Sequence, residues 1–184
     1  MRFLAVFLLS FGLSVTVYAA SLADVQLPDS AQVAGTNLTL NGLGLRKKFF
    51  IKIYVGALYL PAKADSADAV LAHSGPDRVL MHMIYAVDKG QFADAWHEDF
   101  KANNPQSYDA LKDRVEQFIA LFGDSKQGDE ITMDYVPGTG TQVSWDGALR
   151  GTIPGEDFHK ALLNVYMGPN PPTSDLKDGM LGKD

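Results

Sequence analysis

The chain has 184 residues, no cysteine and a formal net charge of −6 at pH 7. The lack of cysteine excludes disulfides, thiolate metal ligands and a cysteine nucleophile, and the acidic balance argues against nucleic acid as a partner. Hydrophobic residues make up 46% of the chain and charged residues 21%, which is typical of a globular domain and not of a disordered chain.

The first residues have the pattern of an export signal. Met1-Arg2 gives a positively charged start, residues 3–17 are almost wholly apolar, and small residues precede a cleavage point after Ala19. This order is typical of a secretory signal peptide, and the apolar run of about 15 residues is shorter than the ~20 that span a bilayer. We therefore expect residues 1–19 to be a signal peptide and residues 20–184 to form one periplasmic or secreted domain with no stable membrane span. An uncleaved N-terminal anchor is the alternative.

The first part of the expected domain predicts three strands and a short helix. Alternating residues over 33–40 predict a half-buried strand, and the sequence NGLG at 41–44 predicts a glycine turn after it. The aromatic and β-branched run at 49–60 is typical of a strand buried on both faces. A short helix capped by its first residue is expected over 66–72, and another apolar strand over 79–85.

Two helices are expected next. Asp88 and Gln91 form a capping-box pattern before a helix over 89–101. Asn104-Pro105 is typical of a helix start with proline in the first turn, and Gly123 marks the end of the apolar period that follows.

The last part of the chain predicts three hairpin strands and two more helices, over 130–136, 141–145, 148–152, 155–167 and 174–180. Asp146-Gly147 is a type I′ turn signal between the second and third of these strands. Strands followed by helices and then by strands indicate an α+β domain, with an antiparallel sheet and helices on one face.

Few chemical motifs stand out. The four histidines do not form a pair at helical spacing, so no metal site is expected: His73, His82, His97 and His159. The chain has no nucleotide-binding loop or nucleophile elbow, and no cofactor is expected. Adjacent Glu98 and Asp99 diverge on a helix, and Arg46 next to two lysines is typical of a solvated hairpin when taken alone.

Seven segments together resemble the chalcone isomerase-like family, in particular its exported bacterial branch. They lie in order between about residues 33 and 182, and read NGLGLR (41–46), FIKIYVGALYL (50–60), WHEDF (96–100), MDYVPGTGT (133–141), GEDF (155–158), YMG (166–168) and PPTSDLK (171–177).

The resemblance implies an open-faced β-sandwich of chalcone isomerase type. In this fold a large antiparallel sheet carries a helical layer on one face, and a ligand cleft lies between the sheet and the helices. Plant members close a flavanone ring there without a cofactor. Fatty-acid-binding members hold a lipid carboxylate with an arginine and a tyrosine, and other members are non-catalytic.

The resemblance also carries over residue by residue. Arg46 matches the family arginine that faces the cleft. Tyr54 falls at the isomerase threonine, Phe92 at a tyrosine whose hydroxyl is lost here, Asp99 at an asparagine and Val165 near a late Ser/Thr. Ring closure needs a proton source and polarising groups, so the loss of these hydroxyls favours a protein that binds without catalysing.

We therefore expect an exported, non-catalytic protein that binds a small amphipathic carboxylate such as a fatty acid. The candidate ligand-binding residues are Arg46, Tyr54, His82, Phe92, Trp96 and Asp99. One alternative is a cofactor-free intramolecular lyase or isomerase acting on an enone-type substrate, with Arg46 as its retained catalytic candidate and Tyr54, His82 or Asp99 transferring the proton. Another is an accessory protein whose cleft is filled by its own side chains.

Overall fold

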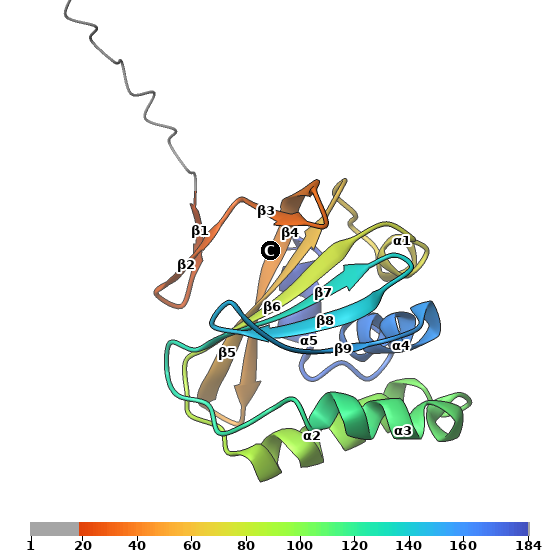
Figure 1. The fold of residues 1–184 in the computed structure, drawn as a ribbon. Coiled ribbons are helices and arrows are strands. Elements are labelled where there is room, and N and C mark those ends of the chain that lie inside the picture. The colour runs from red at the N-terminus through yellow and green to blue at the C-terminus, as the bar shows by residue number, and fades with distance from the viewer. Residues whose placement is uncertain (1–18, 184) are drawn as a thin grey trace, which may run out of the picture.

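A computed structural model of the chain describes residues 19–183 and shows one curled antiparallel sheet with helices (Figure 1). The expected signal peptide, except Ala19, lies outside these residues. Seven strands follow one another in chain order across the sheet: β3 (Ser30–Val33), β4 (Thr36–Lys48), β5 (Ile51–Leu60), β6 (Asp77–Met83), β7 (Glu130–Val136), β8 (Gly140–Trp145) and β9 (Ala148–Ile153). A separate hairpin consists of β1 (Ala19–Leu22) and β2 (Val25–Pro28).

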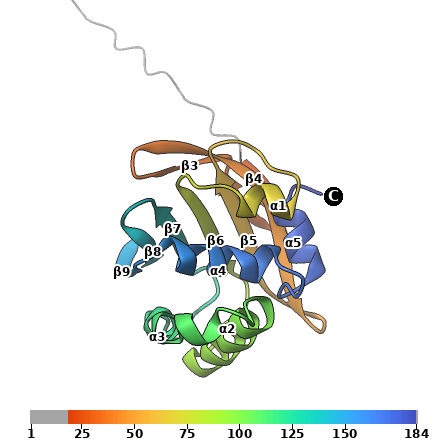
Figure 2. The same cartoon turned by 90° about the vertical axis from the view of Figure 1, so that its right-hand side faces the viewer.

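Helices cover one face of the sheet, as Figure 2 shows from the side. They are α1 (Ala67–Leu71), α2 (Lys89–Asn103), α3 (Tyr108–Ile119), α4 (Glu156–Met167) and α5 (Ser174–Met180). The main apolar core lies between this layer and the sheet, and a smaller core lies on the other face beneath the β1–β2 hairpin. This arrangement confirms the predicted α+β fold with a helical layer on one face.

Strand β5 contributes to both cores from Tyr54 onward, as its apolar sequence predicts, but the first two residues of the predicted run, Phe49 and Phe50, form an exposed turn. Every residue from Tyr54 to Leu60 is buried. Tyr54 and Leu58 point into the main core, whereas Val55 and Tyr59 point into the smaller one, because successive side chains of a strand alternate between the two faces. This double burial fixes the position of the strand that carries Tyr54.

The predicted turn at 41–44 is wrong, because β4 continues through it to Lys48 and turns at Phe49 and Phe50 instead. Gly42 and Gly44 instead allow α5 to approach the backbone of β4 closely. A Cβ atom on Gly42 would collide with the carbonyl oxygen of Gly179, and one on Gly44 with that of Leu176. Helix α5 therefore lies directly on the backbone of β4.

The Asp88 capping box is present at the start of α2, but α3 begins later than the Asn104-Pro105 pattern predicts, at Tyr108. Asn104 is instead the C-cap of α2, and its buried amide donates to the carbonyls of Phe100 and Ala161, each at 3.1 Å. Since its side chain is used at the end of one helix, it does not start the next.

A buried ionisable pair joins the sheet to α4. Nε2 of His159 lies 2.8 Å from Oδ2 of Asp77 on β6, and the histidine ring stacks on Tyr135 with the ring centroids 3.8 Å apart. Both members of the pair are at most 3% exposed. Oδ1 of Asp77 and Nδ1 of His159 have no hydrogen-bond partner among the described residues, so each group depends on the other for its hydrogen bond.

Candidate ligand-binding site

A cavity of about 310 Å³ lies between the β4–β5 hairpin and α2. Its walls are mainly apolar and include Ile53, Val87, Phe92 and Ala95, and Arg46 stands at its edge. A more polar hollow of about 510 Å³ adjoins it along α2, and Arg46 and Asp99 both line it. Arg46 thus stands between an apolar space and a polar one.

A larger hollow of about 560 Å³ lies elsewhere, between β1, β4 and the end of α5. Its buried polar side chain is Asn41, whose amide already bonds the carbonyls of Ala64 and Met180 and the backbone N–H of Ala64. A site whose buried polar groups are all satisfied offers a ligand little to bind, so the cavity next to Arg46 is the better candidate.

Arg46 has the environment of an arginine that binds an anion. It pairs with Tyr54 in the β4–β5 register, and its guanidinium carbon lies 5.7 Å from the centroid of the Tyr54 ring, within cation–π range. Burial disfavours its charge, but Tyr54 and Asp99 outweigh that effect and raise the pKa of Arg46 above its ordinary value. Arg78 and Arg114 have carboxylate partners, whereas Arg46 has no ion pair within residues 19–183. Its charge is therefore free to meet a ligand carboxylate.

Two buried phenols lie beside Arg46. Tyr54 is 1% exposed and Tyr166, from α4, is 0% exposed, and burial raises the pKa of both hydroxyls. The hydroxyl of Tyr166 lies close to that of Tyr54 but makes no hydrogen bond of good geometry with any residue from 19 to 183. An unpaired buried hydroxyl costs about 1–3 kcal/mol, so a polar atom that reached this cluster would be stabilised there.

Asp99 on α2 is close enough to Arg46 for their charges to interact. Burial raises the pKa of Asp99 to about 6, while Arg46 acts in the opposite direction and Glu98 adds to the rise. Below this pH the Asp99 side chain is mostly neutral. Above it, the carboxylate competes with any anionic ligand for Arg46 and repels that ligand.

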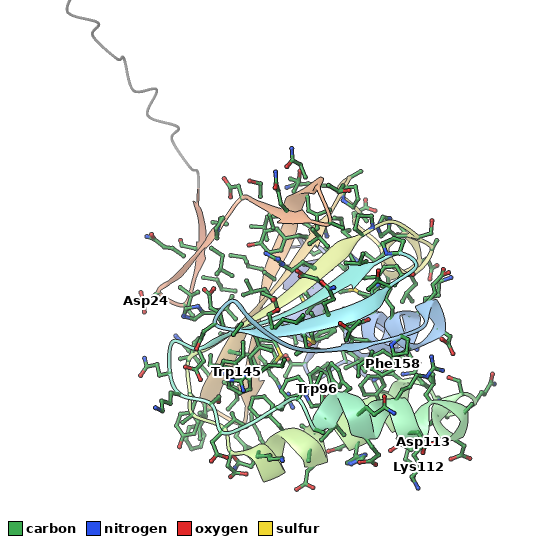
Figure 3. All side chains as sticks on the ribbon, in the orientation of Figure 1. Asp24, Trp96, Lys112, Asp113, Trp145 and Phe158 are labelled. Carbon is green, nitrogen blue, oxygen red and sulfur yellow. The ribbon has the colours of Figure 1, made fainter. Side chains whose placement is uncertain are left out.

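Phe92 lines the cavity, with its ring centroid 5.3 Å from that of Phe122. Trp96 lines neither the cavity nor the polar hollow. It lies in the aromatic core between the sheet and α2–α3 (Figure 3), 4.9 Å from Phe118 and 6.3 Å from Tyr166 between ring centroids. It therefore packs in the core that holds Tyr166.

The structure does not bring His82 together with the other candidate residues at the cavity. His82 pairs in register with Val55, which points into the smaller core, whereas the neighbouring Met83 pairs with Tyr54 on the helix side. Its Nδ1 lies 3.0 Å from Oε1 of Glu130. Alternation along β6 places it on the face opposite the cavity.

The residue that sequence reasoning missed is Tyr166. The resemblance to the isomerases placed their late Ser/Thr near Val165, which is fully buried in the main core. Tyr166 shares the buried apolar side of α4 with core residues such as Phe158 and Leu162. A phenol in a core usually finds a partner for its hydroxyl, and that requirement was the available signal.

The antiparallel sheet, its single helical layer and the cleft beside Arg46 define an α+β protein of the open-faced sandwich type. The sequence model described as chalcone isomerase-like matches residues 19–182, and the chain belongs to this family. A search among curated proteins finds no match.

A solved structure with a similar fold is the crystal structure of a fatty-acid binding protein from Arabidopsis thaliana. The two structures superpose with a TM-score of 0.66 at 16% sequence identity, covering 89% of this chain and 96% of the plant chain. At this identity the likeness shows the shared fold. In addition, none of the helices in residues 19–183 combines the length and the apolar character needed to cross a bilayer.

Proposed function

We propose that this protein binds a fatty acid or a similar small amphipathic carboxylate between the sheet and α2, without transforming it. The observation that carries the proposal is Arg46, a cation with no ion pair in the described chain, held against buried Tyr54 at the edge of an apolar cavity. The structural likeness to a plant fatty-acid binding protein supports it.

The arrangement suits an amphipathic ligand in both charge and size. An arginine can bind a carboxylate through two parallel hydrogen bonds, while Ile53, Phe92 and Ala95 provide an apolar wall for the tail. The volume of about 310 Å³ is near the lower end of the ~300–1,000 Å³ range of small-molecule pockets. This size favours a short or medium acyl chain.

One observation favours the second candidate, a cofactor-free lyase or isomerase for an enone-type substrate. Asp99 has a pKa of about 6, which suits proton transfer near neutral pH, and it lies in the same hollow as Arg46. Against this candidate, Phe92 offers no hydroxyl at the cavity wall, and Val165 is buried in the core.

The ligand proposal is tested by titrating the delipidated protein with fatty acids of increasing chain length in a calorimeter. Arg46→Ala is expected to weaken binding at least tenfold, because a hydrogen bond to a charged group contributes about 1.5–3 kcal/mol. Arg46→Lys keeps the positive charge but cannot make the bidentate hydrogen bonds of a guanidinium, so an intermediate affinity is expected. Arg150→Ala removes an exposed cation from β9 and should bind like the wild type.

In the same experiment, Asp99→Asn is expected to strengthen ligand binding, whereas Arg46→Ala weakens it. The Asp99→Asn variant should bind more tightly than the wild type at pH 8, where Asp99 is ionised, and the two affinities should converge towards pH 5. Equal affinity of wild type and Arg46→Ala, or no binding of any chain length, would contradict the proposal. Turnover of an enone panel that is lost in Arg46→Ala would favour the isomerase instead.

We also propose that the protein is exported, to the periplasm or outside the cell, as an exported member of its family. The support is the sequence of residues 1–19, with its positive start, apolar run and small residues before the cleavage point. Mass spectrometry of the protein isolated from its producing cell should give a chain that starts at Ala20. A chain that retains residues 1–19 in a membrane fraction would indicate the uncleaved anchor.

A further inference from the structure

The turn between β4 and β5 exposes two adjacent aromatic side chains. Phe49 is 88% exposed and Phe50 92% exposed. The turn lies at the end of the sheet nearest α2 (Figure 2). Phe49 also has a φ of +57°, which is unusual for a bulky residue. We call residues 47–52 the hairpin tip. Water is an unfavourable environment for so much clustered apolar surface.

The hairpin tip is also strongly basic. It carries Lys47, Lys48 and Lys52, all exposed, and no acidic residue, although the whole chain has a net charge of −6. Lys47 pairs with Asp175 at 3.1 Å, whereas Lys48 and Lys52 form no ion pair with any residue from 19 to 183. Exposed aromatic rings between lysines are typical of segments that bind the interface of anionic membranes.

The hairpin tip continues directly into the candidate ligand-binding site. Lys48, Phe49 and Ile51 line the same cavity as Arg46. Tyr85, which is 52% exposed, also lines this cavity. A surface that met the hairpin tip would therefore meet the opening of the cavity.

We propose that the hairpin tip docks on an anionic lipid membrane, with Phe49 and Phe50 inserted among the acyl chains and the lysines at the headgroup phosphates. A second copy of the chain is a poorer occupant. Two aromatic side chains bury about 150–250 Å² each, well below the ~800 Å² per partner of a stable protein interface. A lipid surface needs no such area, because the lysines add electrostatic attraction to an anionic surface.

Docking in this position would place the cavity opening at the membrane surface, where a fatty acid partitions. That consequence rests on the proposed ligand, but the docking itself does not. The two can therefore fail separately: vesicle binding reports the hairpin tip, and calorimetric titration reports Arg46.

The test is cosedimentation of the protein with vesicles of phosphatidylcholine alone and of equimolar phosphatidylcholine and phosphatidylglycerol. The aromatic variant is Phe49→Asn with Phe50→Ser, since asparagine tolerates a positive φ. The charge variant is Lys48→Glu with Lys52→Glu. Leu149→Ser is the control, because Leu149 is a large apolar residue, 60% exposed on β9, outside the hairpin tip.

The wild type and Leu149→Ser should sediment with the anionic vesicles, and binding should decrease steeply in about 1 M salt, where the Debye length is ~3 Å. Both hairpin variants should bind at least about tenfold more weakly, because one reverses two of the three lysine charges and the other removes both aromatic rings. Arg46→Ala should still sediment. Equal binding by the aromatic variant, or no binding by the wild type, would overturn the proposal. A wild-type dimer in solution that the aromatic variant abolishes would also overturn it and would assign the hairpin tip to a second copy.

Discussion

Gly44→Ala is expected to lower the free energy of unfolding by about 3 kcal/mol or more, at the upper end of overpacking effects. The added methyl group would occupy the position of the Leu176 carbonyl oxygen. Because this neighbour is helix backbone and not a flexible side chain, α5 as a whole must move. Its displacement would uncover Leu176 and Met180, which are both fully buried in the main core.

Urea unfolding followed by tryptophan fluorescence measures this effect. Gly123→Ala is the matched control, since an added Cβ there has no neighbour within 4 Å and the glycine has no positive φ. The control should change stability by less than about 0.5 kcal/mol. If both variants unfold at the same urea concentration as the wild type, β4 and α5 do not pack closely enough to exclude a methyl group at Gly44.

His159→Phe is expected to destabilise the fold by about 3 kcal/mol, because it leaves a buried ionisable group without its hydrogen-bond partner. Phenylalanine keeps a ring on Tyr135 but leaves the carboxylate of Asp77 buried without its partner. His97→Phe is the control, because His97 is partly exposed at the surface of α2, 3.6 Å from Glu116, and such contacts contribute ~1 kcal/mol or less.

The pH dependence of the His159→Phe deficit follows from Asp77. Burial raises the pKa of Asp77, and His159 opposes that rise, so its loss raises the pKa further. A raised pKa means that the folded state favours the protonated Asp77 carboxyl. This contribution to the free energy of unfolding is fully present below the ordinary pKa of 3.8. It is lost as the pH rises through the pKa of Asp77 in the folded state. The deficit should therefore be larger at pH 8 than at pH 5.

The double variant Asp77→Leu, His159→Phe completes this test. Replacing both partners with apolar residues should recover most of the stability, because the uncompensated charge is removed. If the double variant is as unstable as His159→Phe alone, the deficit arises from packing and not from the buried carboxylate.

The elements that the sequence predicts best are those with strong local signals. The β5 run and the Asp88 capping box are both found in the structure, and the type I′ turn has positive φ at Asp146 and Gly147. Arg46 and Tyr54 are brought together because they face each other across one hairpin, so their pairing depends on local register alone.

The errors involve information that is not local. Gly42 and Gly44 resemble turn glycines in the sequence. They are required because α5, more than 130 residues further along the chain, packs against their backbone. His82 lies in an apolar strand, and the composition of that strand does not reveal which face its histidine occupies. Tyr166 reaches the cluster only through the packing of α4.

The amide of Asn41 also has a consequence for how the chain reaches its native state. It bonds the carbonyl of Ala64 and, across 139 positions of sequence, that of Met180. Strand β4 can pair with β3 and β5 early, but its outer backbone surface stays open to water until α5 has been synthesised and has docked. Closing so long a loop is slow compared with forming a hairpin. The native state is therefore completed only after translation has passed α5, and until then the nascent chain stays incompletely folded along this edge.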